Sequence, residues 1–215
     1  MAVPSDRRQS FGEEIANCLT HGIAALLVLC SLPAMAITAY RKGTTADVVG
    51  CSIFCIAIFL MFLMSALYHA MEPESRHKKI FKILDHIFIY VAIAGSYTPI
   101  ALRVIGGWKA VAILSLQWGL VLFGILYKSL VREATPKVSM TVYMVMGWAV
   151  VLMLPSFYRN AGPELFWLIF AGGICYSLGA VFYALKSMRF HHTIWHLFVF
   201  AGAGCHYAGI CGFLY

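Results

Sequence analysis

Seven long apolar runs, separated by short polar connections, constrain the fold of this 215-residue chain more than any other feature. A helix needs about 20 mostly apolar residues to cross the hydrocarbon core of a bilayer. Only helices and closed β-barrels can satisfy the backbone in lipid, and these runs are too long and too uniform for barrel strands. The sequence therefore predicts an all-α bundle of seven transmembrane helices. We place the spans at about 14–40, 46–70, 80–103, 108–128, 138–158, 163–186 and 192–214, after a short N-terminal segment at 1–13.

The composition indicates that lipid, rather than water, is the solvent of this chain. Hydrophobic residues make up 61% of the sequence and charged residues 12%, whereas a soluble domain carries about 25% charged residues. The formal net charge of +7 does not predict nucleic-acid binding, because the basic residues form short clusters between the apolar runs. The polar start, MAVPSDRRQSFGEE, and the length of the first span predict that there is no cleavable signal peptide.

The distribution of lysine and arginine between the two sides predicts the orientation of the bundle. One side holds the N-terminus and the second, fourth and sixth connections, and its basic residues are Arg7, Arg8, Arg76, Lys78, Lys79, Lys82, Lys128, Arg132, Lys137, Lys186 and Arg189. The other side holds only Arg41, Lys42, Arg103, Lys109 and Arg159. Because short cytoplasmic connections are enriched in these residues, we expect the N-terminus in the cytoplasm and the C-terminus outside.

Ionisable side chains inside membrane spans are costly, and they indicate a functional site. In this chain they are His21, His69, Asp85, His86, His192, His196 and His206. In the predicted topology, His69 ends the second span and Asp85 lies near the start of the third, both at the cytoplasmic side. His192 and His196 begin the seventh span at the same side. Since the histidines played no part in assigning the topology, their convergence at one depth is independent support for a shared site.

The spacing of the histidines predicts a zinc site. His192 and His196 are four residues apart, so both imidazoles lie on one helix face and can chelate one ion. A third histidine from another helix, with one position open for water, is the pattern of catalytic zinc, and His69 is the natural third ligand. Asp85 suits the role of holding and deprotonating that water. Ser65, one turn before His69, is the second candidate catalytic residue.

Four further residues are expected to support the site or to line the space near it. His206 lies about 15 Å beyond His196 along a straight helix, so it cannot share a tetrahedral ion with that residue. We expect His206 to face the bundle interior as a hydrogen-bonding residue. Asn17 and His21, near the start of the first span, lie at about the depth of the zinc ligands. Tyr97 belongs to a polar, proline-containing stretch of the third span that predicts a kink.

The seven cysteines are expected to be buried free thiols. None belongs to a C-x-x-C pair, and all lie within or at the edges of apolar runs, where free cysteine behaves as a small hydrophobe. They are Cys18, Cys30, Cys51, Cys55, Cys175, Cys205 and Cys211.

Three segments carry a family resemblance. SALYH (65–69), ILDHIFIYVAIAGSYTPI (83–100) and HTIWHLFVFAGAGCHY (192–207) resemble the hemolysin III family of bacterial membrane proteins. That family belongs with the adiponectin and progestin receptors in one superfamily. The resemblance covers nearly the whole chain from about Glu13 onward. The short length of the chain is similar to that of the bacterial branch, which implies the bacterial inner membrane as its location.

The resemblance implies a fold, a cofactor and a set of activities. The superfamily fold is a seven-helix bundle with its N-terminus inside. Adiponectin receptors hold zinc by three histidines beside an aspartate that engages water, and the matching positions here are His69, His192 and His196, with Asp85. The adiponectin receptors are linked to ceramide hydrolysis, and a wider view treats the superfamily as lipid-modifying metal-dependent hydrolases. The hemolysin III name reflects a cytolytic activity of some members.

Three functions remain open from the sequence. The first is an intramembrane zinc hydrolase that acts on a lipid amide or ester at the inner leaflet. The second is a receptor or membrane-state sensor in which zinc is structural, with Asp85 as a fourth ligand. The third is a pore-forming cytolysin or an ion transporter, although the sequence shows no internal repeat of the kind that many transporters carry.

Overall fold

The computed structural model describes residues 9–131 and 135–214, and within these ranges it contains helices and no strand. The α-helices are α1 (Phe11–Lys42), α2 (Thr45–Ala70), α3 (Arg76–Ile100), α4 (Gly107–Leu130), α5 (Pro136–Trp148), α6 (Leu154–Asn160), α7 (Pro163–Ala184) and α8 (His191–Phe213). A π-helix, Ala101–Ile105, continues α3, and a 3₁₀ helix, Ala149–Met153, joins α5 to α6. Seven helical segments are long and apolar enough to cross a membrane, which confirms the predicted fold class. The chain is an integral membrane protein.

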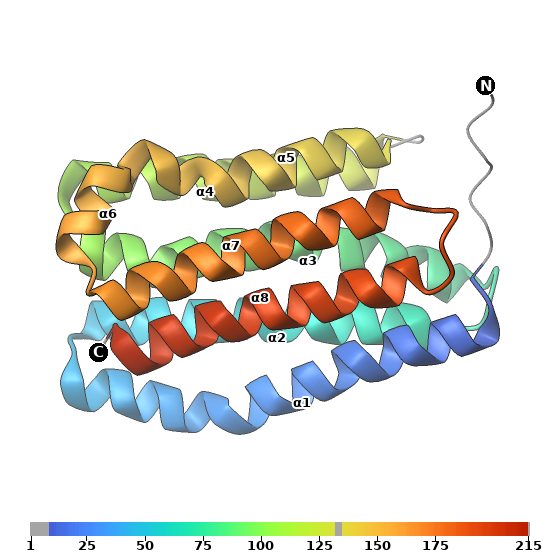
Figure 1. The fold of residues 1–215 in the computed structure, drawn as a ribbon, viewed down its shortest axis with the longest axis horizontal. Helices are drawn as coiled ribbons and strands as arrows, with labels where there is room; N and C mark the ends of the chain where they lie inside the picture. Colours follow the sequence, from blue (N-terminus) through green and yellow to red (C-terminus); the bar gives the residue numbers. More distant parts are fainter. Residues whose placement is uncertain (1–8, 132–134, 215) are drawn as a thin grey trace.

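The helices lie side by side along the long axis of the molecule (Figure 1). In this view α1, α2 and α8 form one side of the bundle, α4 and α5 form the other, and α3 and α7 lie between them. The last helix, α8, packs against α1, α2 and α3 as well as against α7. Residues from the C-terminal helix therefore meet residues from the first three helices.

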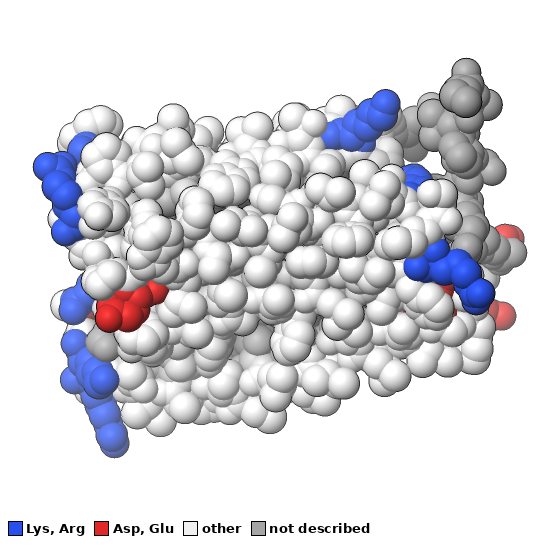
Figure 2. Space-filling model, viewed as in Figure 1, with Lys and Arg blue, Asp and Glu red and all other residues white. Residues whose placement is uncertain are grey.

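Charged side chains gather at the two ends of the bundle. On the face shown in Figure 2, lysine and arginine lie at both ends, and the wide band between them carries no charged side chain. This arrangement fits a bundle whose middle lies in lipid, where ionised side chains are costly. The orientation stays a prediction, and three residues that it uses, Arg7, Arg8 and Arg132, lie outside the described residues, as does most of the predicted N-terminal segment.

The first helix begins at Phe11, three residues before the predicted boundary at 14, because Ser10 and Glu13 form a capping box. Ser10 Oγ accepts a hydrogen bond from Glu13 N at 3.3 Å, and Glu13 Oε2 accepts one from Ser10 N at 2.8 Å. The other carboxylate oxygen, Oε1, accepts from Phe190 N at 2.8 Å, one residue before α8. The same side chain therefore caps α1 and holds the start of α8 beside it.

The fifth span, predicted as one run at 138–158, consists of α5, the 3₁₀ helix and α6. Pro155 lies in the first turn of α6, where it has no N–H to donate and its ring crowds the carbonyl four residues earlier, so it favours an interruption of the α-helix here. The Tyr97 hydroxyl of α3 donates to Gly147 O at 2.8 Å and accepts from Val150 N at 2.7 Å. Tyr97, predicted beside a kink of its own helix, thus satisfies backbone groups at the interruption of a neighbouring one.

The end of the bundle far from the N-terminus is held by a buried carboxylate. Asp47 Oδ2 accepts from the N–H and the hydroxyl of Thr44, at 2.7 and 2.8 Å, in a capping box at the start of α2. It also pairs with Arg103 Nη1 at 3.2 Å, which ties α2 to the π-helix. Asn160 Nδ2 donates to Val104 O at 2.9 Å and joins α6 to the same segment.

Candidate metal centre

Three histidines from two helices lie together at the end of the bundle where α1 begins. His69 is in the last turn of α2, and His192 and His196 are in the first two turns of α8. Each offers a ring nitrogen, and these three atoms all lie within 4.8 Å of one another. The ring centroids of the three pairs are 4.7 to 5.1 Å apart. His69 and His196 are buried, at 4% and 1% exposure, and His192 is partly buried.

A carboxylate from α1 contacts the Nδ1 side of the His69 ring. Glu14 Oε2 lies 2.7 Å from His69 Nδ1, and its other oxygen, Oε1, accepts from Lys78 Nζ of α3 at 2.8 Å. A carboxylate at Nδ1 fixes the ring as the tautomer with its proton on that atom, which leaves the lone pair of Nε2 available. His69 Nε2 is buried and has no hydrogen-bond partner among the described residues.

The His196 ring is oriented by the backbone of α1. Its Nδ1 lies 3.2 Å from Asn17 O and 3.3 Å from Thr20 Oγ1. A carbonyl oxygen can only accept, so the proton sits on Nδ1 and the opposite nitrogen is free to coordinate. The Asn17 side chain also contacts α8, the helix that carries His196, because its Oδ1 accepts a hydrogen bond from Thr193 Oγ1 at 2.6 Å. Asn17 therefore supports the site through both its backbone and its side chain.

His21 packs flat against His196. The two ring centroids are 3.6 Å apart and the ring planes differ by 3°, while Phe62 contacts His21 edge-on at 5.0 Å. Neither ring nitrogen of His21 has a hydrogen-bond partner among the described residues, and the side chain is 3% exposed. The stack restricts rotation of the His196 ring, so His21 acts on the site by packing rather than as a fourth ligand in this arrangement.

The cluster has the donor chemistry of a zinc site. Buried polar atoms in native proteins almost always have a partner, yet the Nε2 atoms of His69 and His192 have none within the described part of the chain. A metal ion held by the three rings would satisfy these atoms. Three imidazoles, with one position left for water or substrate, match the ligand set of catalytic zinc. The residues present therefore fit a bound transition metal.

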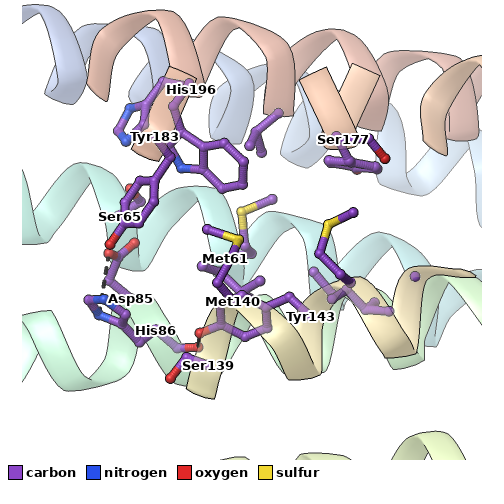
Figure 3. Close-up of a pocket in the computed structure, with 18 of the residues that line it drawn as sticks. Met61, Ser65, Asp85, His86, Ser139, Met140, Tyr143, Ser177, Tyr183 and His196 are labelled. Atoms are coloured by element: carbon purple, nitrogen blue, oxygen red, sulfur yellow. Dashed lines mark hydrogen bonds and ion pairs between the residues drawn. The ribbon is translucent and has the colours of Figure 1, made fainter. Parts of the chain in front are cut away.

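A cavity of about 560 Å³ opens from the histidines into the bundle. Figure 3 shows Ser65, Asp85 and Tyr183 on the side of the cavity where His196 lies, while Met61 lies farther along it. Much of the remaining lining is apolar and includes Ile93, Met140, Phe166, Phe170, Trp195 and Val199. The volume falls within the range of about 300–1,000 Å³ that is usual for ligand pockets.

The carboxylate of Asp85 faces this cavity together with His86. Asp85 Oδ2 lies 3.9 Å from His86 Nδ1, and that nitrogen donates to Lys82 O of the same helix at 2.6 Å. Tyr143 of α5 donates its hydroxyl to His86 O at 2.8 Å and so fixes α3 at this point. Ser65 Oγ is buried, and it has no hydrogen-bond partner among the residues that the structure describes.

His206 lies apart from the cluster, in the direction that helix geometry requires. Its Nε2 donates to Ile169 O of α7 at 3.1 Å, and its ring contacts Tyr176 edge-on at 5.4 Å. Gly172 leaves the space for the ring, since a Cβ at that position would overlap it. His206 lines the deeper part of the same cavity and makes the interior hydrogen bond expected from its position.

Comparison with known proteins agrees with these observations. The family model described as Haemolysin-III related matches residues 9–207. This chain belongs to the haemolysin-III related family. It is 39% identical to Hemolysin-3 of Bacillus cereus, over 89% of this chain and 87% of that protein. It is 40% identical to the Hemolysin-3 homolog of Bacillus subtilis, over 89% of each chain, and 29% identical to the Monocyte to macrophage differentiation factor of Homo sapiens, over 94% of this chain and 85% of the human protein.

The sequence does not predict the roles of two residues of this haemolysin-III related chain that contact the predicted ligands, Glu14 and Thr20. The predicted first span begins at Glu14, which puts that side chain at the membrane boundary, and no pattern singles out Thr20. A signal for Glu14 was present, because Glu14, Asn17 and His21 follow one another by three and four residues and so share one helix face. The capping box at Ser10 starts the helix early enough to put Glu14 on that face.

Proposed function

We propose that this chain is a zinc-dependent hydrolase that cleaves an amide or ester bond of a membrane lipid. The observation that carries the proposal is the opening of the three-histidine cluster onto a largely apolar cavity that also holds a carboxylate and a buried hydroxyl. In the predicted orientation, the cluster lies at the cytoplasmic leaflet. A lipid could then keep its acyl chain in the apolar part and present its polar linkage to the histidines.

The residues around the cluster have separable roles in this proposal. Zinc, when bound, would supply Lewis-acid chemistry that polarises a carbonyl and acidifies water. Asp85 accepts the proton of a water molecule in the cavity as a general base. His86, 3.9 Å from that carboxylate, stabilises the ionised form when it carries a proton. The Ser65 hydroxyl donates a hydrogen bond to the oxygen on which negative charge develops.

A structural metal is the second candidate, and one observation favours it. The three ligands tie α2 to α8, and hydrogen bonds extend the connection to α1 through Glu14 and Asn17 and to α3 through Lys78. A metal at this junction would hold four helices together in a receptor or membrane-state sensor without any reaction. The two candidates differ in what Asp85 does.

The test compares wild-type protein with Asp85→Asn in lipid nanodiscs. Amide- and ester-linked lipids with fluorescent long acyl chains serve as substrates, and zinc content is measured on the same samples. We expect Asp85→Asn to keep its zinc and to lose about 10²- to 10⁴-fold in turnover, the usual contribution of general-base catalysis. Glu72→Gln, an exposed carboxylate at the same end, is the matched control and keeps its activity. Zinc-loaded wild-type protein without turnover of any of these lipids would exclude the hydrolase and leave the structural candidate.

A further inference from the structure

A group of three cysteines lies at the opposite end of the two helices that carry the histidines. Cys51 and Cys55 are near the start of α2, and Cys211 is two residues before the end of α8. Since His69 is near the end of α2 and His192 near the start of α8, the two helices are antiparallel. The thiols and the imidazoles therefore join the same helix pair at opposite ends.

The three thiols lie in one packed region between α2 and α8, where Cys211 packs against the cluster that contains Cys51 and Cys55. The Cys211 side chain interacts with those of both Cys51 and Cys55, which also interact with each other. Cys51 and Cys55 are each 1% exposed, whereas Cys211 is partly exposed. Phe54 of α2 and Tyr207 of α8 have ring centroids 6.3 Å apart and pack the two helices together beside the thiols.

We propose that Cys51, Cys55 and Cys211 form a redox site that closes as a disulfide between α2 and α8. Cys211 is the obligatory member, because Cys51 and Cys55 share one helix and Cβ atoms four residues apart stand about 5–6 Å from each other. A disulfide needs Cβ atoms about 3.5–4.5 Å apart, so those two cannot pair without distorting the helix. Cys211 can pair with either of them from the facing helix.

The oxidant is a small peroxide, and the chemistry balances. The partly exposed Cys211 thiol attacks the peroxide oxygen, which gives a sulfenic acid and releases one water. The Cys51 or Cys55 thiol then displaces that hydroxyl as a second water and forms the S–S bond. Two thiols lose two protons and two electrons, and hydrogen peroxide is reduced to two waters. In the predicted orientation this end of the bundle faces outside, where disulfides persist.

Peptide mapping of the wild-type protein in nanodiscs tests the proposal directly. The protein is fully reduced, freed of reductant, treated with hydrogen peroxide, then denatured and alkylated with N-ethylmaleimide before proteolysis. We expect a cross-linked peptide that joins Cys211 to Cys51 or Cys55 and that a phosphine reductant removes. The thermal midpoint of the cross-linked protein should also rise, because the bond restricts the unfolded chain.

Serine variants assign the partners. Cys211→Ser and the double variant Cys51→Ser/Cys55→Ser should lose the cross-link, while each single α2 variant should keep a link to the remaining cysteine. Cys30→Ser, at an exposed cysteine of α1, is the control and should cross-link as the wild type does.

Another thiol contact, between Cys175 of α7 and Cys205 of α8, provides the competing outcome. It lies near the middle of both helices, farther from either end of the bundle. Peroxide-treated wild-type protein in which Cys211 remains fully alkylated, or in which only Cys175 and Cys205 are linked, would overturn the proposal.

Discussion

Each end of the bundle holds a carboxylate with several partners, buried at Asp47 and partly buried at Glu14, but the two carboxylates act on different kinds of partner. At the far end, Asp47 accepts hydrogen bonds from the backbone and side chain of Thr44 and from Arg103. At the end where α1 begins, Glu14 holds His69 from behind, and the opposite nitrogen of that ring points to two other histidines without a hydrogen-bond partner among the described residues.

The comparison shows how a carboxylate that stabilises the fold, Asp47, differs from one that orients a residue of the candidate metal site, Glu14. The Asp47 carboxylate accepts hydrogen bonds from Thr44 and Arg103, so its contribution is to hold α2 and the π-helix together. The Glu14 network ends on a lone pair, which is costly to leave buried and unpaired. The unpaired nitrogen of His69 lies beside the ring nitrogens of two other histidines, which is the arrangement that a metal ion would require. Mutations near the histidines should therefore change the zinc content or affinity, whereas mutations at the Asp47 end should change the thermal stability.

The largest effect is expected from removing a ligand. His192→Ala should lower the zinc affinity by more than the ~10–100-fold that is typical for removing a residue that merely supports a ligand. Elemental mass spectrometry measures the number of zinc ions per purified chain. This number should fall from about one to near zero, since two histidines do not complete a tetrahedral site. His77→Ala, an exposed histidine at the same end, is the control and should keep its zinc. Equal zinc in wild-type and His192→Ala protein would remove the distinction between the two ends.

A smaller loss is expected from the supporting carboxylate. Glu14→Gln keeps the size of the side chain but replaces the charged acceptor at His69 Nδ1 by an amide and removes the charge that faces Lys78. We expect zinc affinity to fall about 10–100-fold, as is usual for groups that orient a ligand. Competition with a chelator of known affinity measures the change, and Glu72→Gln is the matched control. An unchanged affinity would mean that Glu14 only anchors the helices.

The smallest effect on the site is expected from the far end. Asp47→Ala removes the capping box of α2 and the partner of Arg103 and should cost about 1–2 kcal/mol of stability, the usual loss for a helix cap. The thermal midpoint should fall while the zinc content stays at the wild-type value. Loss of zinc in a folded Asp47→Ala protein would contradict the separation of the two ends.

The sequence predicted the proximity of the three histidines because two independent regularities point to it. The spacing of His192 and His196 sets a shared helix face, and the alternation of spans sets the depth of His69 relative to them. The relative depth of the three histidines depends only on the order of the helices and their approximate ends, so shifts of a few residues at the span boundaries do not change it. The structure places the three ring nitrogens together accordingly.

Other features depend on contacts that no local pattern contains. Glu14 reaches His69 across 55 positions of sequence, and whether an interfacial glutamate turns inward depends on how α1 packs against α2 and α3. The interruption of the fifth span follows from Pro155, but its stabilisation requires the Tyr97 hydroxyl from another helix. The expectation of seven buried thiols is wrong for Cys30, which is exposed, and only Cys51 and Cys55 are fully buried. The proximity of thiols from α2 and α8 is a tertiary property that no local pattern contains.

X-ray absorption at the zinc edge, on purified protein reconstituted with one equivalent of zinc, tests most directly that His69, His192 and His196 share one metal ion. We predict three histidine nitrogens at about 2.0–2.1 Å, with any additional ligand being oxygen. His192→Ala protein, which we expect to hold almost no zinc, should lose the scattering signal of the imidazole ligands. A first shell containing sulfur at about 2.3 Å would place the metal at cysteines instead and contradict the account.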